Sequence, residues 1–133
     1  MVELVFVLLI LLIVLFGIGE VSIALYDKAV LTNASRVGAR AGIVAQDPRV
    51  TDGPIKEVVK NYATNHLITF GADTLGDEDI TITRTGSSFG SDLTVSVNYR
   101  YDFLAISRLV NMLLVNALGS HMTLNATTVM KLE

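Results

Sequence analysis

Apolar residues are concentrated at the start of the chain. No polar side chain occurs from Leu4 to Gly19, and after Glu20 the apolar character resumes and continues to Leu25. As a helix rising about 1.5 Å per residue, this stretch covers roughly the 30 Å hydrocarbon thickness of a bilayer. The rest of the chain, about a hundred residues, is too small to bury such a helix on all sides. We therefore predict an apolar transmembrane or filament-core helix over residues 1–25.

A cleaved signal peptide is an alternative interpretation of this run, but it needs a basic segment ahead of a shorter apolar stretch. The first cation here is Lys28, which follows the run. By the positive-inside tendency, a cation beyond the span would hold the rest of the chain in the cytoplasm. A basic leader ahead of Met1, removed by processing, would resolve this conflict.

The helical pattern continues beyond the apolar run, because no proline occurs before Pro48 and proline is a strong helix stop. Residues 26–46 are therefore predicted to be an amphipathic continuation of the same helix. Gly17 and Gly19 weaken the helix by up to about 1 kcal/mol each relative to alanine. We predict a bend at these glycines, where the helix leaves the membrane for another packing environment.

Small residues recur every four positions in this continuation, at Ala34, Gly38 and Gly42. Residues with this spacing lie on one helix face, and small side chains allow another element to approach closely. Two interpretations are open. The seam packs against another subunit, or it packs against the domain of its own chain.

Glu3 is a carboxylate at the very tip of the apolar run. A charge there is costly unless it is paired or reaches the lipid headgroups. One interpretation is that Glu3 marks the end of a membrane span. The other is that it neutralises the free N-terminal ammonium of a neighbouring subunit when apolar helices bundle in a filament core. In that case Glu3 sets the assembly register.

Residues 47–133 are predicted to form a small α+β globular head. Asp52-Gly53-Pro54 is typical of a helix start with proline at the first helical position, and apolar residues then recur on one helical face as far as Leu67. The last half changes to period two and predicts three strands, with a hairpin turn over Gly86–Asp92. The apolar connection over residues 103–118 is predicted to be a helical turn or short helix that is buried, touches the membrane or meets another subunit.

The predicted fold class is α+β. A long N-terminal helix with an apolar first half packs through its second half on a small three-stranded antiparallel sheet, accompanied by a short second helix. An antiparallel sheet with one apolar face needs a cover on that face, and the small-residue half of the first helix is suited to provide it. The result is a lollipop shape, with the small head around the second half of the long helix.

The sequence offers no catalytic constellation. It has no cysteine, and its two histidines, His66 and His121, are far apart in the chain. The acidic loop from Asp73 to Asp79 lacks the spacing of an EF-hand, so we expect neither a metal nor a cofactor. A net charge of −3 gives no support for a nucleic-acid partner. We therefore expect a protein that is not an enzyme.

Two asparagines, Asn33 and Asn125, open the triplet Asn-X-Ser/Thr, which is the N-glycosylation acceptor pattern. They are candidate modification sites, although both fall within predicted regular structure.

A resemblance to the TadE-like pilin family of tight-adherence pili lies in the segment VELVFVLLILLIVLFGIGEVSIALYDKAVLTNASRVGARAGI. The shared features are a valine–glutamate opening, an apolar run, a second glutamate, an ALY segment and NA(S/A)R and GARAG-type stretches. The closing LNATTVMKLE is similar to the family's terminal strand.

The resemblance implies a prepilin with a basic leader, which a prepilin peptidase cuts on the cytoplasmic side of the membrane. The pilus assembly machinery would then move the subunit from the cytoplasmic membrane into a homopolymeric extracellular filament, a type IV-like pilus. Glu3 corresponds to the family's glutamate near the mature N-terminus, which is normally the fifth residue after the cut and is third here. A minor pseudopilin and a non-polymerising, single-span membrane-anchored binding domain are the alternatives.

Overall fold

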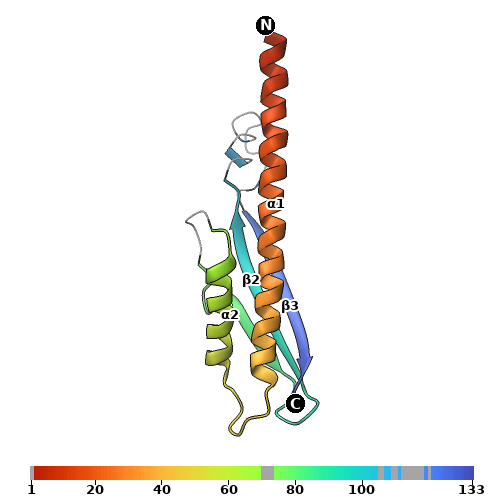
Figure 1. Cartoon of the computed structure of the whole chain (residues 1–133), viewed down its shortest axis with the longest axis vertical. Helices are drawn as coiled ribbons and strands as arrows, with labels where there is room; N and C mark the ends of the chain where they lie inside the picture. Colours follow the sequence, from red (N-terminus) through yellow and green to blue (C-terminus); the bar gives the residue numbers. More distant parts are fainter. Residues whose placement is uncertain (1, 70–73, 105–106, 109–110, 112–118, 120) are drawn as a thin grey trace.

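The computed structural model describes residues 2–69, 74–104, 107–108, 111, 119 and 121–133. Within these residues the helices are α1 (Val2–Ile43) and α2 (Asp52–His66), and the strands are β1 (Ile80–Arg84), β2 (Asp92–Asp102) and β3 (His121–Lys131). The N-terminal end of α1 projects beyond the rest of the chain, and its C-terminal half lies beside α2 and the sheet (Figure 1). The predicted α+β arrangement is confirmed.

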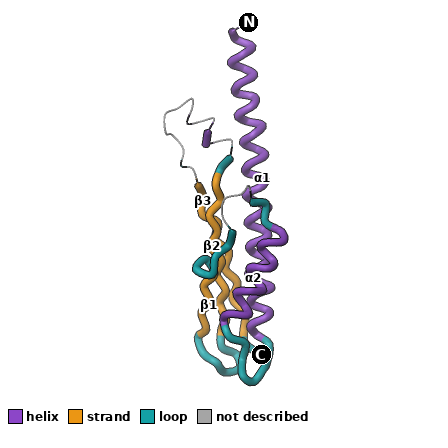
Figure 2. Tube along the Cα trace, turned by 90° about the vertical axis from the view of Figure 1, so that its left-hand side faces the viewer, coloured by secondary structure: helices purple, strands orange, loops and turns teal. Residues whose placement is uncertain are grey.

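The three strands form one antiparallel sheet in the order β1-β2-β3. In the central strand β2, Val95 lies opposite Ile82 of β1, and Tyr99 lies opposite Leu124 of β3. Both helices lie on one side of the sheet (Figure 2). Burial alternates along β2, so the covered face carries its apolar side chains: Leu93, Val95, Val97, Tyr99 and Tyr101.

The helix α1 is buried on one side only, and only from Glu20 onward. The buried residues recur every three or four positions, which places them on one helix face. They are Glu20, Ala24, Asp27, Val30, Leu31, Ala34, Ser35, Gly38, Ala39 and Gly42. This face packs against α2, β2 and β3.

The C-terminal end of α1 is at Ile43, three residues before the predicted end at Gln46. The Ile43 carbonyl accepts a hydrogen bond of 3.1 Å from the backbone N–H of Glu133. The last four carbonyls of a helix have no partner within the helix. A residue distant in the sequence therefore satisfies one of them, and a further helical turn is not needed.

The second helix, α2, has Thr51 at its N-cap and Asp52 as its first residue. Pro54 is therefore the third helical residue, and the prediction of proline at the first position was wrong. Proline is tolerated there because the N–H groups of the first turn have no acceptor within the helix. The buried face of α2 consists of Ile55, Val59 and Ala63.

The turn between β1 and β2 is the hairpin that the sequence predicted. The N–H of Thr85 donates to the Asp92 carbonyl at 3.0 Å, and Gly90 has a φ of +83°, a conformation that glycine adopts without a steric penalty. The predicted short helix in the connection over residues 103–118 lies mostly outside the described residues. At its start, Phe103 packs edge-on against Tyr101, with ring centroids 5.6 Å apart.

Replacing Ser35 by alanine is expected to lower the free energy of unfolding by about 1 kcal/mol. The buried Ser35 Oγ donates to the Thr32 carbonyl at 2.9 Å and lies 2.7 Å from Thr128 Oγ1 on β3. Alanine would leave the Thr128 hydroxyl without this partner between α1 and the sheet. Urea unfolding of the full chain in detergent, followed by circular dichroism, measures the change.

The matched control for Ser35 is Thr32→Ala. The Thr32 hydroxyl donates to the Lys28 carbonyl at 2.9 Å in its own helix and does not reach the sheet. Its removal is expected to change the free energy of unfolding by less than about 0.5 kcal/mol. Equal losses in the two variants would contradict a role for Ser35 in joining α1 to β3.

Candidate assembly interface

The N-terminal half of α1 is an apolar surface that its own head leaves bare. Val2 and Leu4 are each 72% exposed and Leu12 is 39% exposed, whereas Leu9 and Ile13 are half-buried. None of the most apolar 18-residue window of this helix is buried, and the window is long and apolar enough to cross a membrane. A helix that is apolar on all sides is stable only when lipid or protein surrounds it.

Glu3 lies in the first turn of α1, at the end of this bare segment. The N-terminus of a helix carries a partial positive charge, which favours an acidic residue there. The head is far away along the helix (Figure 1), and no described residue forms a hydrogen bond or an ion pair with Glu3. Its pairing in an assembly stays a prediction.

The predicted bend at Gly17 and Gly19 is not seen in the single chain, where α1 is unbroken from Val2 to Ile43. A Cβ atom added at Gly19 would meet no heavy atom within 4 Å. No contact within the chain therefore requires glycine at this position. The bend stays a prediction for α1 in another environment.

The seam of Ala34, Gly38 and Gly42 faces the chain's own head. A Cβ atom added at Gly38 would lie 2.3 Å from Val59 Cγ2, and one added at Gly42 would lie 2.5 Å from Leu93 Cδ2. Real Cβ atoms do not approach other atoms so closely, so these glycines allow α1 to contact α2 and the sheet. Of the two interpretations of the seam, packing within the chain is the one the structure supports.

Three buried polar residues lie where α1 leaves the head. Asp27 is fully buried, and its Oδ1 accepts a hydrogen bond of 3.0 Å from the N–H of Ile68, which ties the segment after α2 to α1. Glu20 is 6% and Tyr101 is 2% exposed. Burial raises the pKa of the Tyr101 hydroxyl, and the carboxylates of Glu20 and Asp27 raise it further.

Burial of these polar residues was not predicted from the sequence, although the sequence carries one signal of it. Glu20 and Asp27 are seven residues apart, which is about two helical turns, so they lie on the same helix face. Ala24 and Leu31 have the same seven-residue spacing. The acidic residues thus lie on the face that continues the small-residue seam. Continuing that face toward the N-terminus would have predicted buried carboxyl groups at the edge of the head.

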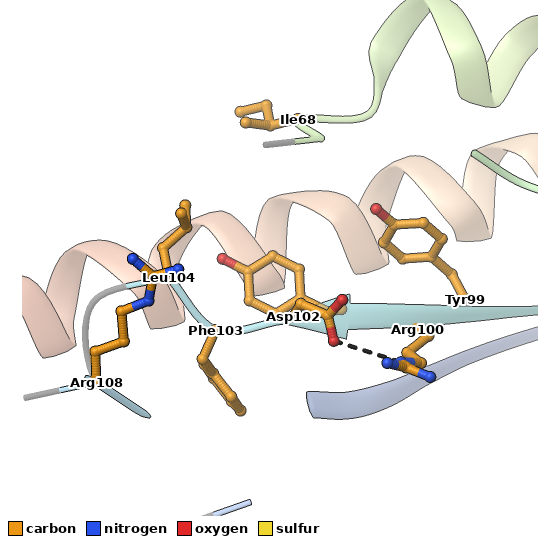
Figure 3. A pocket seen from close by; sticks show the side chains of 8 residues that line it. Ile68, Tyr99, Arg100, Asp102, Phe103, Leu104 and Arg108 are labelled. Carbon is orange, nitrogen blue, oxygen red and sulfur yellow. Dashed lines mark hydrogen bonds and ion pairs between the residues drawn. The ribbon is translucent and has the colours of Figure 1, made fainter. Parts of the chain in front are cut away.

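A cavity of about 200 Å³ lies beside this junction, at the end of β2. Figure 3 shows Tyr99, Phe103 and Leu104 around it, with Arg100 and Asp102 joined by an ion pair of 3.4 Å. Its described lining includes no histidine, serine or threonine, so these residues provide no histidine-based nucleophile–base pair. The described residues also contain no group of three side chains that could hold a metal ion.

The remaining sequence candidates lie apart from one another. Asn33 is exposed on α1, and Asn125 is exposed on β3, where its amide donates to the side-chain oxygen of Asn98. Glycosylation at either position stays a prediction. His66 stacks on Tyr62, with ring centroids 4.4 Å apart, and its Nδ1 lies 2.8 Å from the Tyr62 carbonyl oxygen.

Comparison with known protein families gives a match to the family described as TadE-like protein, over residues 1–40. The matched segment contains the whole bare half of α1 and most of the part that packs on the head. It is also the segment in which the sequence resemblance was found. The match indicates a Tad pilus-related protein with an N-terminal apolar helix. Comparisons with curated proteins and with solved structures found no match.

Proposed function

We propose that the chain is a structural pilin subunit that polymerises through its N-terminal helix into an extracellular Tad-type pilus. The observation that carries this proposal is the bare apolar half of α1, which extends past the head with its large side chains exposed (Figure 1). Lipid can cover such a surface, and so can the apolar helices of other subunits. The helix of a pilin is surrounded first by lipid and, after assembly, by the helices of other subunits.

Before assembly, residues 1–25 lie in the cytoplasmic membrane, and in the filament the same residues form the core. This transfer changes the burial of apolar surface little, because lipid chains are as apolar as leucine side chains. Close packing and the pairing of polar groups must therefore favour the filament. The expected partners are further copies of this chain, a prepilin peptidase and the pilus assembly machinery.

Replacing Glu3 by glutamine is expected to reduce filament yield about tenfold or more, the factor that corresponds to the loss of ~1.4 kcal/mol. Glutamine has nearly the same shape but no charge, so it cannot neutralise a cation in the filament core, where no solvent screens the pair. Membrane insertion should be unchanged, because the apolar run is intact. Sheared filaments are quantified against the membrane fraction.

The matched control is Glu57→Gln, which makes the same chemical change at an exposed position of α2. It is expected to leave both filament yield and membrane insertion unchanged. Normal filament yield from the Glu3 variant would contradict the assembly role of this carboxylate.

Mass spectrometry of filaments sheared from the native cells tests the proposed function itself. If the chain is the abundant component, it is a structural subunit of the shaft. If it is found in the membrane fraction alone, it is a minor pseudopilin or a non-polymerising membrane-anchored binding domain.

A further inference from the structure

We propose that the Lys28 ammonium of one copy pairs with the Glu3 carboxylate of a second copy displaced by about 37 Å along the filament. This inference rests on the proposed function and specifies which surfaces of two subunits meet. The partner surface is the exposed side of α1 where it joins the head.

The first argument concerns which basic side chains of the described residues already have a partner within the same chain. Nearly every lysine and arginine of the head is bonded to an acidic group or to a carbonyl of its own head. Lys60 and Asp77 are 2.9 Å apart, and Lys131 and Asp92 are 3.5 Å apart. The other such pairs are Arg84–Asp52, Arg100–Asp102, Lys56 with the Asp77 carbonyl and Arg49 with the Glu133 carbonyl.

Four basic side chains in the described part of the chain have no such partner: Lys28, Arg36, Arg40 and Arg108. Three of them lie on the exposed side of α1. Glu3 is also unpaired at the other end of the same helix. An unpaired carboxylate in an apolar bundle needs a cation from another copy, and α1 presents its cations outward.

Lys28 is distinguished from the two arginines by its position next to the bare apolar segment of α1, because Arg36 and Arg40 line a separate hollow farther along the helix with Val37, Tyr62 and Met130. It lines a groove of about 320 Å³ together with Val21, Ala24 and Leu25 of α1 and with Phe103, Met122 and Leu124 from the sheet side. Val21 is 52% exposed and Leu25 is 65% exposed, so the groove continues the bare apolar surface of α1 onto the head. The apolar first turn of a second copy is a suitable occupant. A pair formed beside it would be in a medium of low dielectric constant, which strengthens the attraction.

The second argument is the separation of the two charges. Glu3 and Lys28 are twenty-five residues apart on one unbroken helix, which corresponds to about 37 Å at 1.5 Å per residue. This length slightly exceeds the roughly 30 Å hydrocarbon thickness of a bilayer. A copy that is drawn outward by about 37 Å, slightly more than one span, brings its Glu3 level with the Lys28 of a copy still in the membrane.

The pairing defines how far one copy is displaced relative to the next during assembly. The carboxylate of the outgoing copy meets a cation as it leaves the far side of the bilayer. A carboxylate has two oxygens, so the contact with Lys28 is compatible with a second contact to an N-terminal ammonium.

The test is zero-length cross-linking of wild-type filaments with a carbodiimide, which joins a carboxylate to a primary amine that touches it. The expected product is a peptide in which Glu3 is bonded to Lys28. The two residues are far apart in one copy, so the bond must join two copies. The Lys60–Asp77 pair, 2.9 Å apart within the head, is the internal positive control.

The matched variants are Lys28→Arg and Lys28→Gln. Arginine keeps the charge but does not form the amide, so the cross-link should disappear while filaments persist. Glutamine should reduce filament yield about tenfold, which corresponds to ~1.4 kcal/mol, whereas Arg36→Gln should not.

Two results would overturn the inference while the proposed function stands. The first is filaments in which Lys60 is cross-linked to Asp77 but Glu3 is joined to the N-terminal amine alone or to nothing. The second is normal assembly of Lys28→Gln. Absence of the chain from filaments would contradict the proposed function.

Discussion

Replacing Leu31 by alanine is expected to lower the free energy of unfolding by about 3 kcal/mol, the largest effect of any single change considered for the head. Leu31 is fully buried in the cluster that α1, α2 and the sheet share. Alanine removes apolar contacts and leaves a cavity that the surrounding elements fill only in part. Urea unfolding of the full chain in detergent, followed by the circular dichroism of the sheet, measures the loss.

Leu25→Ala is the matched control, because it makes the same change on the same helix at a side chain that is 65% exposed. Its expected effect on the free energy of unfolding is within about 0.5 kcal/mol. If both variants lose the same stability, the C-terminal half of α1 is not part of the core of the head.

Replacing Gly38 by alanine is expected to lower the free energy of unfolding by about 2 kcal/mol. The added Cβ would lie 2.3 Å from Val59 Cγ2 and 3.6 Å from Ile55 Cγ2. Both of these residues are fully buried in α2, so neither has room to move away. The methyl group must therefore push α1 and α2 apart. The same unfolding experiment measures this change.

The control for Gly38 is Gly19→Ala on the same helix, where an added Cβ meets no atom within 4 Å. Alanine has the better helix propensity by up to about 1 kcal/mol, so this variant should be neutral or slightly more stable. The two glycine substitutions are thus expected to act in opposite directions. A stabilising effect at Gly38 would contradict the close approach of the two helices.

The elements with a clear periodicity were predictable from the sequence, and for a physical reason. The alternation of Leu93, Val95 and Val97 puts these side chains on one face of β2, and a face so apolar must be covered. The apolar run from Leu4 to Gly19 likewise determines the character of the first half of α1. These features depend on residues that are close together in the sequence, so the sequence alone reveals them.

Features that depend on distant contacts were not predictable in the same way. The end of α1 at Ile43 is linked to the N–H of Glu133, far away along the chain. The spacing of Gly38 and Gly42 predicted close packing. The same spacing allows close packing against a helix of another molecule or against α2 of the same chain, so it does not identify the partner. Only the fold shows that Val59 and Leu93 fill the space beside them.

The same distinction applies to the two candidate assembly residues, Glu3 and Lys28. The sequence drew attention to Glu3, because a carboxylate at the end of an apolar run is conspicuous. It did not draw attention to Lys28, which is ordinary as a surface lysine. Lys28 becomes a candidate once all the basic residues of the described head except Arg108 are seen to be bonded to groups of that head, and once its place beside the bare apolar segment is known.

The continuity of α1 has a mechanical consequence for a filament of the proposed kind. In the single chain the helix runs from Val2 to Ile43 without a break, so in a filament where it stays unbent at Gly17 and Gly19 no flexible linker separates the core segment from the head. A load applied to a head is therefore transmitted along helical hydrogen bonds directly to the core. The head can yield only if α1 is pulled from the sheet, which exposes Leu31 and the small residues that follow it. Such a filament resists stretching until whole domains give way.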